Sequence, residues 1–140
     1  ELSGQVNGSS IGRVAKSRRE VHCGAEEVAV YADLYEDLAS FAGWWDFDFS
    51  GTAADHILGL LAARMGRYVQ AVDHFELVIE CSQQAGLQPT LALVSGDYAE
   101  ILLERNASGD SEKAAELHDE SLEIARELGM KSLVERLSAL

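Results

Sequence analysis

The sequence predicts an all-α protein of about six helices. Three observations support this fold class. Apolar residues recur at steps of three and four along most of the chain, which is the period of an amphipathic helix. The 140 residues include a single proline and few runs of β-branched residues, so strands are disfavoured. Two segments, 66–87 and 109–130, resemble each other at a constant offset of 43 residues, which predicts a helical unit used twice.

Length and charge limit the kind of protein. A chain of 140 residues with 47% apolar residues is long enough for one globular domain. No run approaches the ~18 apolar residues of a membrane-spanning helix. We therefore expect no membrane insertion. The net charge of −13 repels phosphate backbones, so we also expect no direct nucleic-acid binding. The chain begins at Glu1 without a signal-peptide pattern, and we therefore expect part of a longer cytoplasmic protein.

Residues 1–24 are expected to form a loosely ordered arm or a helix ahead of a repeat domain at 25–140. Residues 1–10 are small and polar, and four of the eleven basic residues of the chain follow within 13–19. These bases either contact an acidic partner or lie on a solvated helix face or arm. They are Arg13, Lys16, Arg18 and Arg19.

A first helix is predicted from Ala25, because apolar residues then recur on one helical face until the segment GWWDFDFSG at 43–51. That stripe consists of Val28, Tyr31, Ala32, Leu34, Tyr35, Leu38 and Phe41. A second helix is expected from near Thr52 to Gly66. Asp55 follows three residues after the hydroxyl of Thr52, as in an N-terminal cap.

Glycine and proline mark the next helix boundaries. The third helix is predicted at 68–85 and is followed by Gly86, the residue type that most readily adopts the left-handed conformation after a helix. Pro89 suits the first turn of a fourth helix, because proline lacks the N–H that would be unpaired there.

The C-terminal part of the chain predicts two more helices. The turn NASGD at 106–110 ends the fourth helix, and a fifth is predicted at 111–128. Gly129 closes the fifth helix, and a short terminal helix follows at 131–140.

The two repeated segments match at structurally informative residue types. Each has a glycine, an alanine five residues later, a long apolar stripe and a closing glycine. The matching pairs are Gly66 and Gly109, Ala71 and Ala114, Glu80 and Glu123, and Gly86 and Gly129. A helix precedes each segment, so we predict two antiparallel helix hairpins at about 52–86 and 89–129.

Small residues are expected to bring the helices of a hairpin together. Gly59, with Ala62 and Ala63 one turn later, predicts a flat strip on the second helix. We expect Ala71 to pack into this strip, with Leu58 and Phe75 filling its flanks. Closer contact would offset the roughly 1 kcal/mol by which a mid-helix glycine is disfavoured against alanine.

The residues of the first hairpin resemble the tetratricopeptide repeat. The pattern of Leu-Gly followed by Gly, Tyr, Ala and Phe is met by Leu58, Gly59, Gly66, Tyr68, Ala71 and Phe75. In the second unit His118 stands where Phe75 stands in the first, and the offset of 43 exceeds the ~34 residues usual for the repeat. The resemblance implies hairpins stacked as a short right-handed α-solenoid.

The longer repeat, together with the ending ARELGM at 125–130, resembles one group in particular. This is the C-terminal helical-repeat region of large bacterial signal-transduction ATPases, which include LuxR-type transcription regulators and adenylate or guanylate cyclases. The resemblance implies a non-catalytic module that binds a protein or peptide segment, or another domain of its parent chain.

The resemblance also implies which residues line the binding groove, because the first helix of each hairpin faces it. Carried onto this chain, the groove residues would be His56, Leu60, Ala63, Arg64, Glu100 and Glu104. Two alternatives remain: a domain that senses a small effector, and a structural spacer. For the spacer, the apolar residues Leu133, Val134, Leu137 and Leu140 are expected to form an open end or a homodimer surface.

Catalytic and metal motifs are weak in this sequence. Asp46, Asp48, Ser50 and Gly51 fit the opening of a calcium loop, but Ile57 stands where its bidentate glutamate belongs, so no metal is expected. No nucleophile, phosphate-loop or dinucleotide motif occurs, and we expect neither an enzyme nor a bound cofactor. Cys23 and Cys81 do not form a disulfide framework, and we expect them to be small buried hydrophobic residues in a reducing compartment. Trp44 and Trp45 are expected to close the core, with a partner surface as the alternative.

Overall fold

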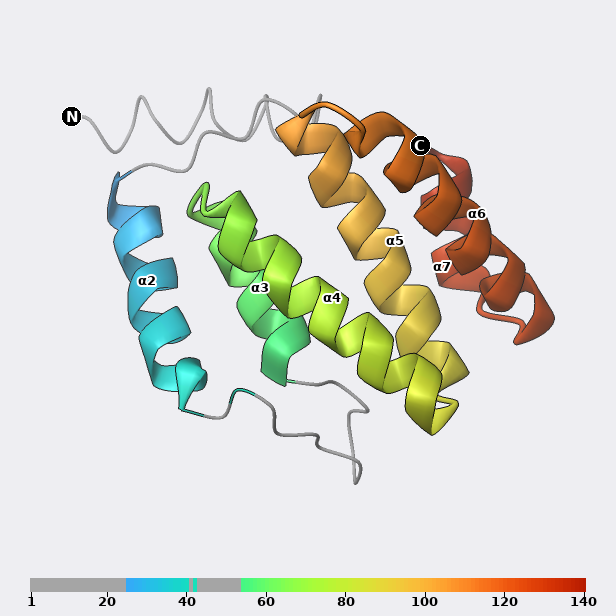
Figure 1. The fold of residues 1–140 in the computed structure, drawn as a ribbon, viewed down its shortest axis with the longest axis horizontal. Helices are drawn as coiled ribbons and strands as arrows, with labels where there is room; N and C mark the ends of the chain where they lie inside the picture. Colours follow the sequence, from blue (N-terminus) through green and yellow to red (C-terminus); the bar gives the residue numbers. More distant parts are fainter. Residues whose placement is uncertain (1–24, 41, 43–53) are drawn as a thin grey trace.

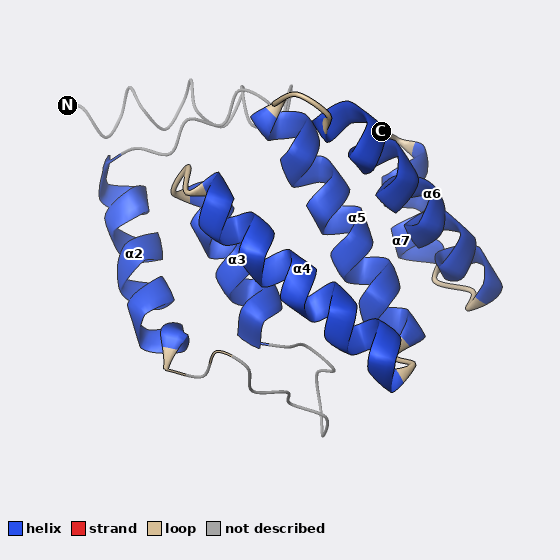
Figure 2. Cartoon of the chain, in the orientation of Figure 1, coloured by secondary structure: helices blue, strands red, loops and turns tan. Residues whose placement is uncertain are grey.

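The computed structural model describes residues 25–40, 42 and 54–140, and in this part of the chain it contains helices and no strand (Figures 1 and 2). The predicted all-α class is therefore confirmed. The helices described are α2 (Ala25–Ala39), α3 (Ala54–Arg64), α4 (Tyr68–Ala85), α5 (Gln88–Arg105), α6 (Asp110–Glu127) and α7 (Lys131–Ser138).

The helix boundaries agree closely with the sequence prediction. The bounds of α4 are those predicted, and Pro89 lies in the first turn of α5 as expected. The remaining starts lie within about two residues of their predicted positions. The proposed Thr52 cap, the calcium-like loop, the two tryptophans, Cys23 and the arm at 1–24 lie outside the described residues.

The repeated glycines adopt the left-handed conformation that their positions require. Gly86 and Gly129 have φ of 70° and 69°. Each is followed by a residue whose N–H bonds a carbonyl five residues earlier: Leu87 N to Ser82 O at 2.9 Å and Met130 N to Ala125 O at 2.8 Å. Because these two turns lie 43 residues apart and share one hydrogen-bond pattern, the sequence repeat is also a repeat of helix ends.

The helices pack mainly against their neighbours in the sequence (Figure 1). The most extensive contacts join α5 with α6 and α3 with α4. Further contacts join α4 with α5, α2 with α3 and α6 with α7, and α3 also touches α5. The chain therefore forms consecutive helix pairs around a core that continues from α3 to α7.

The core is built from alanines and large side chains together. Ala71 and Ala114, which match in the sequence repeat, are 0% and 1% exposed. Phe75 is completely buried, and its ring stacks on the ring of Tyr98 at a centroid distance of 5.4 Å. The packing at Gly59 differs in part from the expectation. We expected Ala71 to pack against Gly59. A Cβ on Gly59 would lie 3.1–3.3 Å from the Phe75 ring, so it is this ring that packs closest to Gly59.

Within residues 25–40 and 54–140, no helix combines the length and the apolar character needed to cross a bilayer.

Candidate functional site

One face of the molecule joins helices α3, α5 and α7 through side chains that the sequence does not place together. His56 comes from the first turn of α3 and is 8% exposed. Its Nε2 donates a hydrogen bond to Asp97 Oδ2 on α5 at 2.7 Å. The pair therefore connects the first helices of the two predicted hairpins.

The second oxygen of the same carboxylate reaches α7. Arg136 Nη2 donates to Asp97 Oδ1 at 2.8 Å, and Arg136 Nε lies 3.5 Å from Glu100 Oε1. A chain of polar contacts thus runs from His56 through Asp97 to Arg136 and Glu100. We refer to these four residues as the polar bridge. Its side chains are 10–32% exposed, so the bridge is mostly buried and only part of it reaches the surface of this face.

A glycine allows α7 to approach α5 at this point. A Cβ on Gly96 would lie 3.1 Å from Ser121 Oγ of α6, 3.2 Å from Leu137 Cδ2 and 3.4 Å from Arg136 Nη2. Because Gly96 directly precedes Asp97, the absence of one side chain brings the Arg136 guanidinium within reach of the carboxylate.

The predicted groove residues are distributed unevenly over this face. His56 and Glu100 belong to the polar bridge, and Leu60 is half-buried against the core. Ala63 is 6% exposed and is therefore a core residue. The remaining two, Arg64 and Glu104, are exposed near the C-terminal ends of α3 and α5.

Sequence reasoning missed Asp97 and Arg136. Both are charged residues, a type that is usually exposed on amphipathic helices. Asp97 and Arg136 lie 39 positions apart in the chain, and His56 lies 41 positions before Asp97. The small residue before Asp97 is the one local signal, because a glycine inside a helix often marks a close approach of another element.

The leucines expected at an exposed end or dimer surface are core residues instead. Leu133 and Leu137 are 5% and 1% exposed, because α7 turns its apolar side toward α5 and α6. His118 Nε2 donates to the Leu137 carbonyl at 2.9 Å and holds the end of α7 on α6. Val134 packs partly on the same core, and Leu140 is 59% exposed.

A second set of polar contacts connects α2, α3 and α4. Asp55 accepts a hydrogen bond from His74 Nδ1 at 2.8 Å, and Tyr35 Oη lies 2.7 Å from His74 Nε2. A carboxylate can only accept, so His74 Nδ1 is the donor to Asp55. The three groups hold α2 to the first hairpin.

A further contact joins α4, α5 and α6 around one carboxylate. Glu76 accepts hydrogen bonds from the Tyr98 hydroxyl, at 2.7 Å, and from Lys113, which lies 5.1 Å from the centroid of the Tyr98 ring. Burial, together with the hydrogen bond to Glu76, raises the pKa of Tyr98 to about 12. Partial burial opposes ionisation of Glu76, but the hydrogen bonds from Lys113 and Tyr98 outweigh it and lower the pKa of Glu76.

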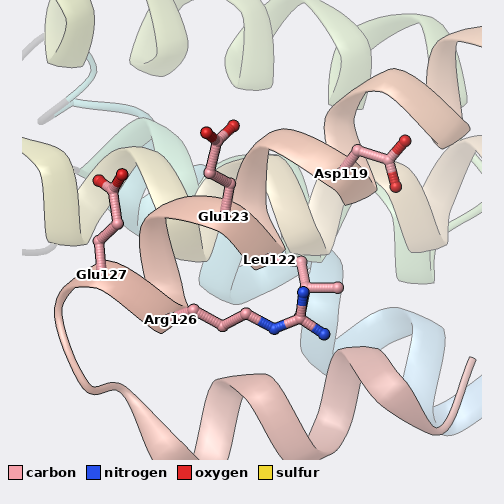
Figure 3. A pocket seen from close by; sticks show the side chains of 5 residues that line it. All are labelled: Asp119, Leu122, Glu123, Arg126 and Glu127. Carbon is pink, nitrogen blue, oxygen red and sulfur yellow. The ribbon is translucent and has the colours of Figure 1, made fainter.

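An open hollow of about 450 Å³ lies on α6 (Figure 3). It is lined by Asp119, Leu122, Glu123, Arg126 and Glu127, all from that helix. In Figure 3 the carboxylates of Glu123 and Glu127 point away from the Arg126 guanidinium, which lies beside Leu122. This hollow lacks the apolar walls from several elements that enclose small-molecule sites.

Among the described residues, no group of three or more His, Cys, Asp or Glu side chains is arranged to hold a metal ion. Cys81 is a free, half-buried thiol.

Comparison of the chain with protein-family models, with curated proteins and with solved structures found no match.

Proposed function

We propose that this chain is a non-catalytic interaction module of a larger bacterial signalling or transcription-regulatory protein, and that it acts in the cytoplasm. In this proposal its hairpins form a short, right-handed tetratricopeptide-like α-solenoid. The motif residues of the first hairpin and the pairwise contacts between consecutive helices support the architecture. The likeness of the repeat to the helical-repeat regions of signal-transduction ATPases supports the parent class.

The observation that carries the proposal is the polar bridge. It connects α3, α5 and α7 on one face of the molecule through side-chain hydrogen bonds. A partner would therefore meet a preformed surface, and little ordering would be needed on binding. We propose that this face binds a protein or peptide segment.

The charges on this face indicate the chemistry of the partner. Arg64 is exposed at the end of α3, whereas Glu104 is exposed at the end of α5. Between the polar bridge and these two residues, the half-buried Leu60 offers apolar surface. A segment that carries both an acidic and a basic residue around an apolar one fits this arrangement.

Peptide selection tests the proposal. The 140-residue chain is immobilised and a displayed library of random peptides is passed over it, in parallel with the variants Arg64→Glu and Arg126→Glu. The control residue Arg126 is also an exposed arginine, and it lies on α6, which contributes no residue to the polar bridge. We expect the wild-type chain and the Arg126→Glu variant to bind the selected peptides equally. The Arg64→Glu variant should bind them about tenfold more weakly, because a rim charge is reversed.

Equal affinity of all three proteins would assign binding to another surface and overturn the groove assignment. Circular dichroism spectra that agree between the variants show that the fold is retained. The homodimer alternative predicts a sedimentation mass that increases with concentration and falls back on substitution of the exposed Leu140 by aspartate.

A further inference from the structure

The hollow on α6 corresponds, through the sequence repeat, to a surface of α4. Helices α4 and α6 end in the same kind of turn, at Gly86 and Gly129, so residues 43 positions apart occupy equivalent places on the two helices. The equivalent pairs at the hollow are Glu76 and Asp119, Ile79 and Leu122, and Gln83 and Arg126. The two surfaces can therefore be compared residue by residue.

The surface on α4 is contacted by the next helix of the same type. Lys113, in the first turn of α6, donates a hydrogen bond to Glu76, and Ile79 is 8% exposed. On α6 the side chain of Asp119 is 84% exposed, against 45% for Glu76, and Leu122 is only partly buried. Among the described helices, none takes the place beside α6 that α6 takes beside α4.

The same difference extends to the helices that follow, α5 and α7, which start 43 residues apart. Ala92 and Ser95 of α5 are completely buried, and the Ala92 carbonyl accepts a hydrogen bond from Ser121 of α6. Their equivalents on α7, Glu135 and Ser138, are exposed. The exposed surface of α6 and α7 thus matches the surface of α4 and α5 against which α6 packs.

The charges of this exposed surface indicate what it can bind. We call it the α6/α7 face, and it consists of Asp119, Leu122, Glu123, Arg126, Glu127 and Glu135. Its exposed residues carry four carboxylates and one guanidinium, and Leu122 provides apolar surface. In Figure 3, Leu122 and Arg126 lie on the side of α6 that faces α7. A helix with one apolar side and an excess of bases is complementary to this combination.

We propose that the α6/α7 face binds a basic amphipathic helix of a partner protein. The bound helix takes the place relative to α6 and α7 that α6 takes relative to α4 and α5. A lysine or arginine in its first turn pairs with Asp119, as Lys113 pairs with Glu76, and its apolar side packs on Leu122. This inference rests on the internal repeat, and it is independent of peptide binding on the α3/α5/α7 face.

Fluorescence anisotropy of a labelled synthetic peptide, titrated with the 140-residue chain, tests the proposal. The peptide has the sequence of residues 110–127 with lysine in place of the exposed acidic residues at 112, 116, 119, 123 and 127. It therefore keeps the packing side of α6 and is basic. A control peptide of the same charge has serine in place of the leucine at 117 and the isoleucine at 124, which are each 8% exposed in α6. We expect the basic peptide to bind about tenfold more tightly than the control, because only the former buries large apolar side chains.

A charge reversal on the protein locates the bound peptide. Asp119→Lys should weaken binding of the basic peptide by about tenfold, since an ion pair is replaced by a repulsion. The matched variant Asp73→Lys makes the same change at an exposed residue of α4. It should stay within about twofold of the wild-type chain, because charges outside the binding face act only through screened attraction. The same is expected of Arg64→Glu, which separates this face from the α3/α5/α7 face.

Three results would overturn the proposal. Absence of binding is the first, and equal affinity of the two peptides, or equal loss in Asp119→Lys and Asp73→Lys, is the second, because it shows attraction by net charge alone. The third is a wild-type sedimentation mass above that of one chain that returns to one chain in Asp119→Lys, which would assign the face to a second copy. Circular dichroism checks that the variants remain folded. Loss of selected random peptides in Arg64→Glu bears only on the α3/α5/α7 face.

Discussion

Gly59 sets the distance between α3 and α4 by the side chain that it lacks. The Phe75 ring fills the space beside it, and that ring is itself held by Tyr98 and by an edge contact with His56 at a centroid distance of 6.2 Å. A larger residue at position 59 would clash with the Phe75 ring, which is completely buried and is packed on its other sides.

We therefore expect Gly59→Leu to destabilise the protein by about 3 kcal/mol, despite the better helix propensity of leucine. Chemical denaturation followed by circular dichroism measures this change. The exposed helical substitution Gln84→Leu serves as the control and should stay within about 0.5 kcal/mol of the wild-type chain. An equal free energy of unfolding for Gly59→Leu and the control would show that the Phe75 ring can move aside to accommodate the leucine.

Two buried serines on facing helices differ in their hydrogen bonding. Ser121 Oγ donates to the Ala92 carbonyl at 2.5 Å, whereas Ser95 Oγ is buried without a hydrogen-bond partner. Ser121→Ala should lower the free energy of unfolding by about 1 kcal/mol, and Ser95→Ala should leave it unchanged or raise it by about 1 kcal/mol. Urea unfolding of both variants measures the difference. Equal losses in the two variants would contradict this assignment.

At the scale of the elements, the turn between α5 and α6 depends on one ion pair. Arg105 donates to both oxygens of Asp110, at 2.8 Å and 2.6 Å, and the Ala107 N–H donates to the same carboxylate at 2.8 Å. The hydrogen bonds from Arg105 lower the pKa of Asp110 to about 2, against an ordinary value of 3.8, although burial opposes the shift.

A lowered pKa in the folded state means that the contact stabilises the fold above the ordinary pKa and that this stabilisation is lost as the pH falls toward the folded value. Wild-type protein should therefore have a higher thermal midpoint than Asp110→Asn at pH 5 and above. The gap between the two should narrow between about pH 4 and pH 2, where Asp110 becomes protonated. Thermal unfolding at several pH values measures the gap, and a gap that stays constant over this interval would contradict the role of the ionised carboxylate.

The elements were predictable from the sequence because their signals are local. Apolar steps of three and four, Pro89, and the glycines at 86 and 129 all act within one or two helical turns, and the helices begin and end where these signals place them. The polar bridge was not predictable, because contacts between Asp97, His56 and Arg136 depend on how three helices pack. The pattern of α7 likewise predicts an apolar side but not what that side meets, and for this reason Leu133 was wrongly expected on a dimer surface.

At the scale of the whole molecule, packing between sequence neighbours makes stability uneven along the chain. Helix α5 has ten buried residues and contacts α3, α4 and α6. None of the described side chains of α2 is buried. Helices α2 and α7 each have fewer contacts to lose than α5.

Native-state hydrogen exchange should therefore show the slowest amides in α5, with those of α2 exchanging about 100-fold faster and α7 lying between them. Exchange of all helices at one common rate would show instead that the molecule opens only as a single cooperative unit. Urea at concentrations below the unfolding midpoint should narrow the range of exchange rates, because the global opening that governs the slowest amides exposes more area than the partial openings and is therefore favoured more by urea.

The hollow on α6 has a consequence for association between molecules. Its acidic residues, Asp119, Glu123 and Glu127, are exposed on a chain that carries a net charge of −13. Two copies brought together through this surface would confront negative charge with negative charge, at a cost that grows as ionic strength falls. Repulsion between these carboxylates therefore disfavours contact between two copies through α6. Any self-association is expected to use other surfaces.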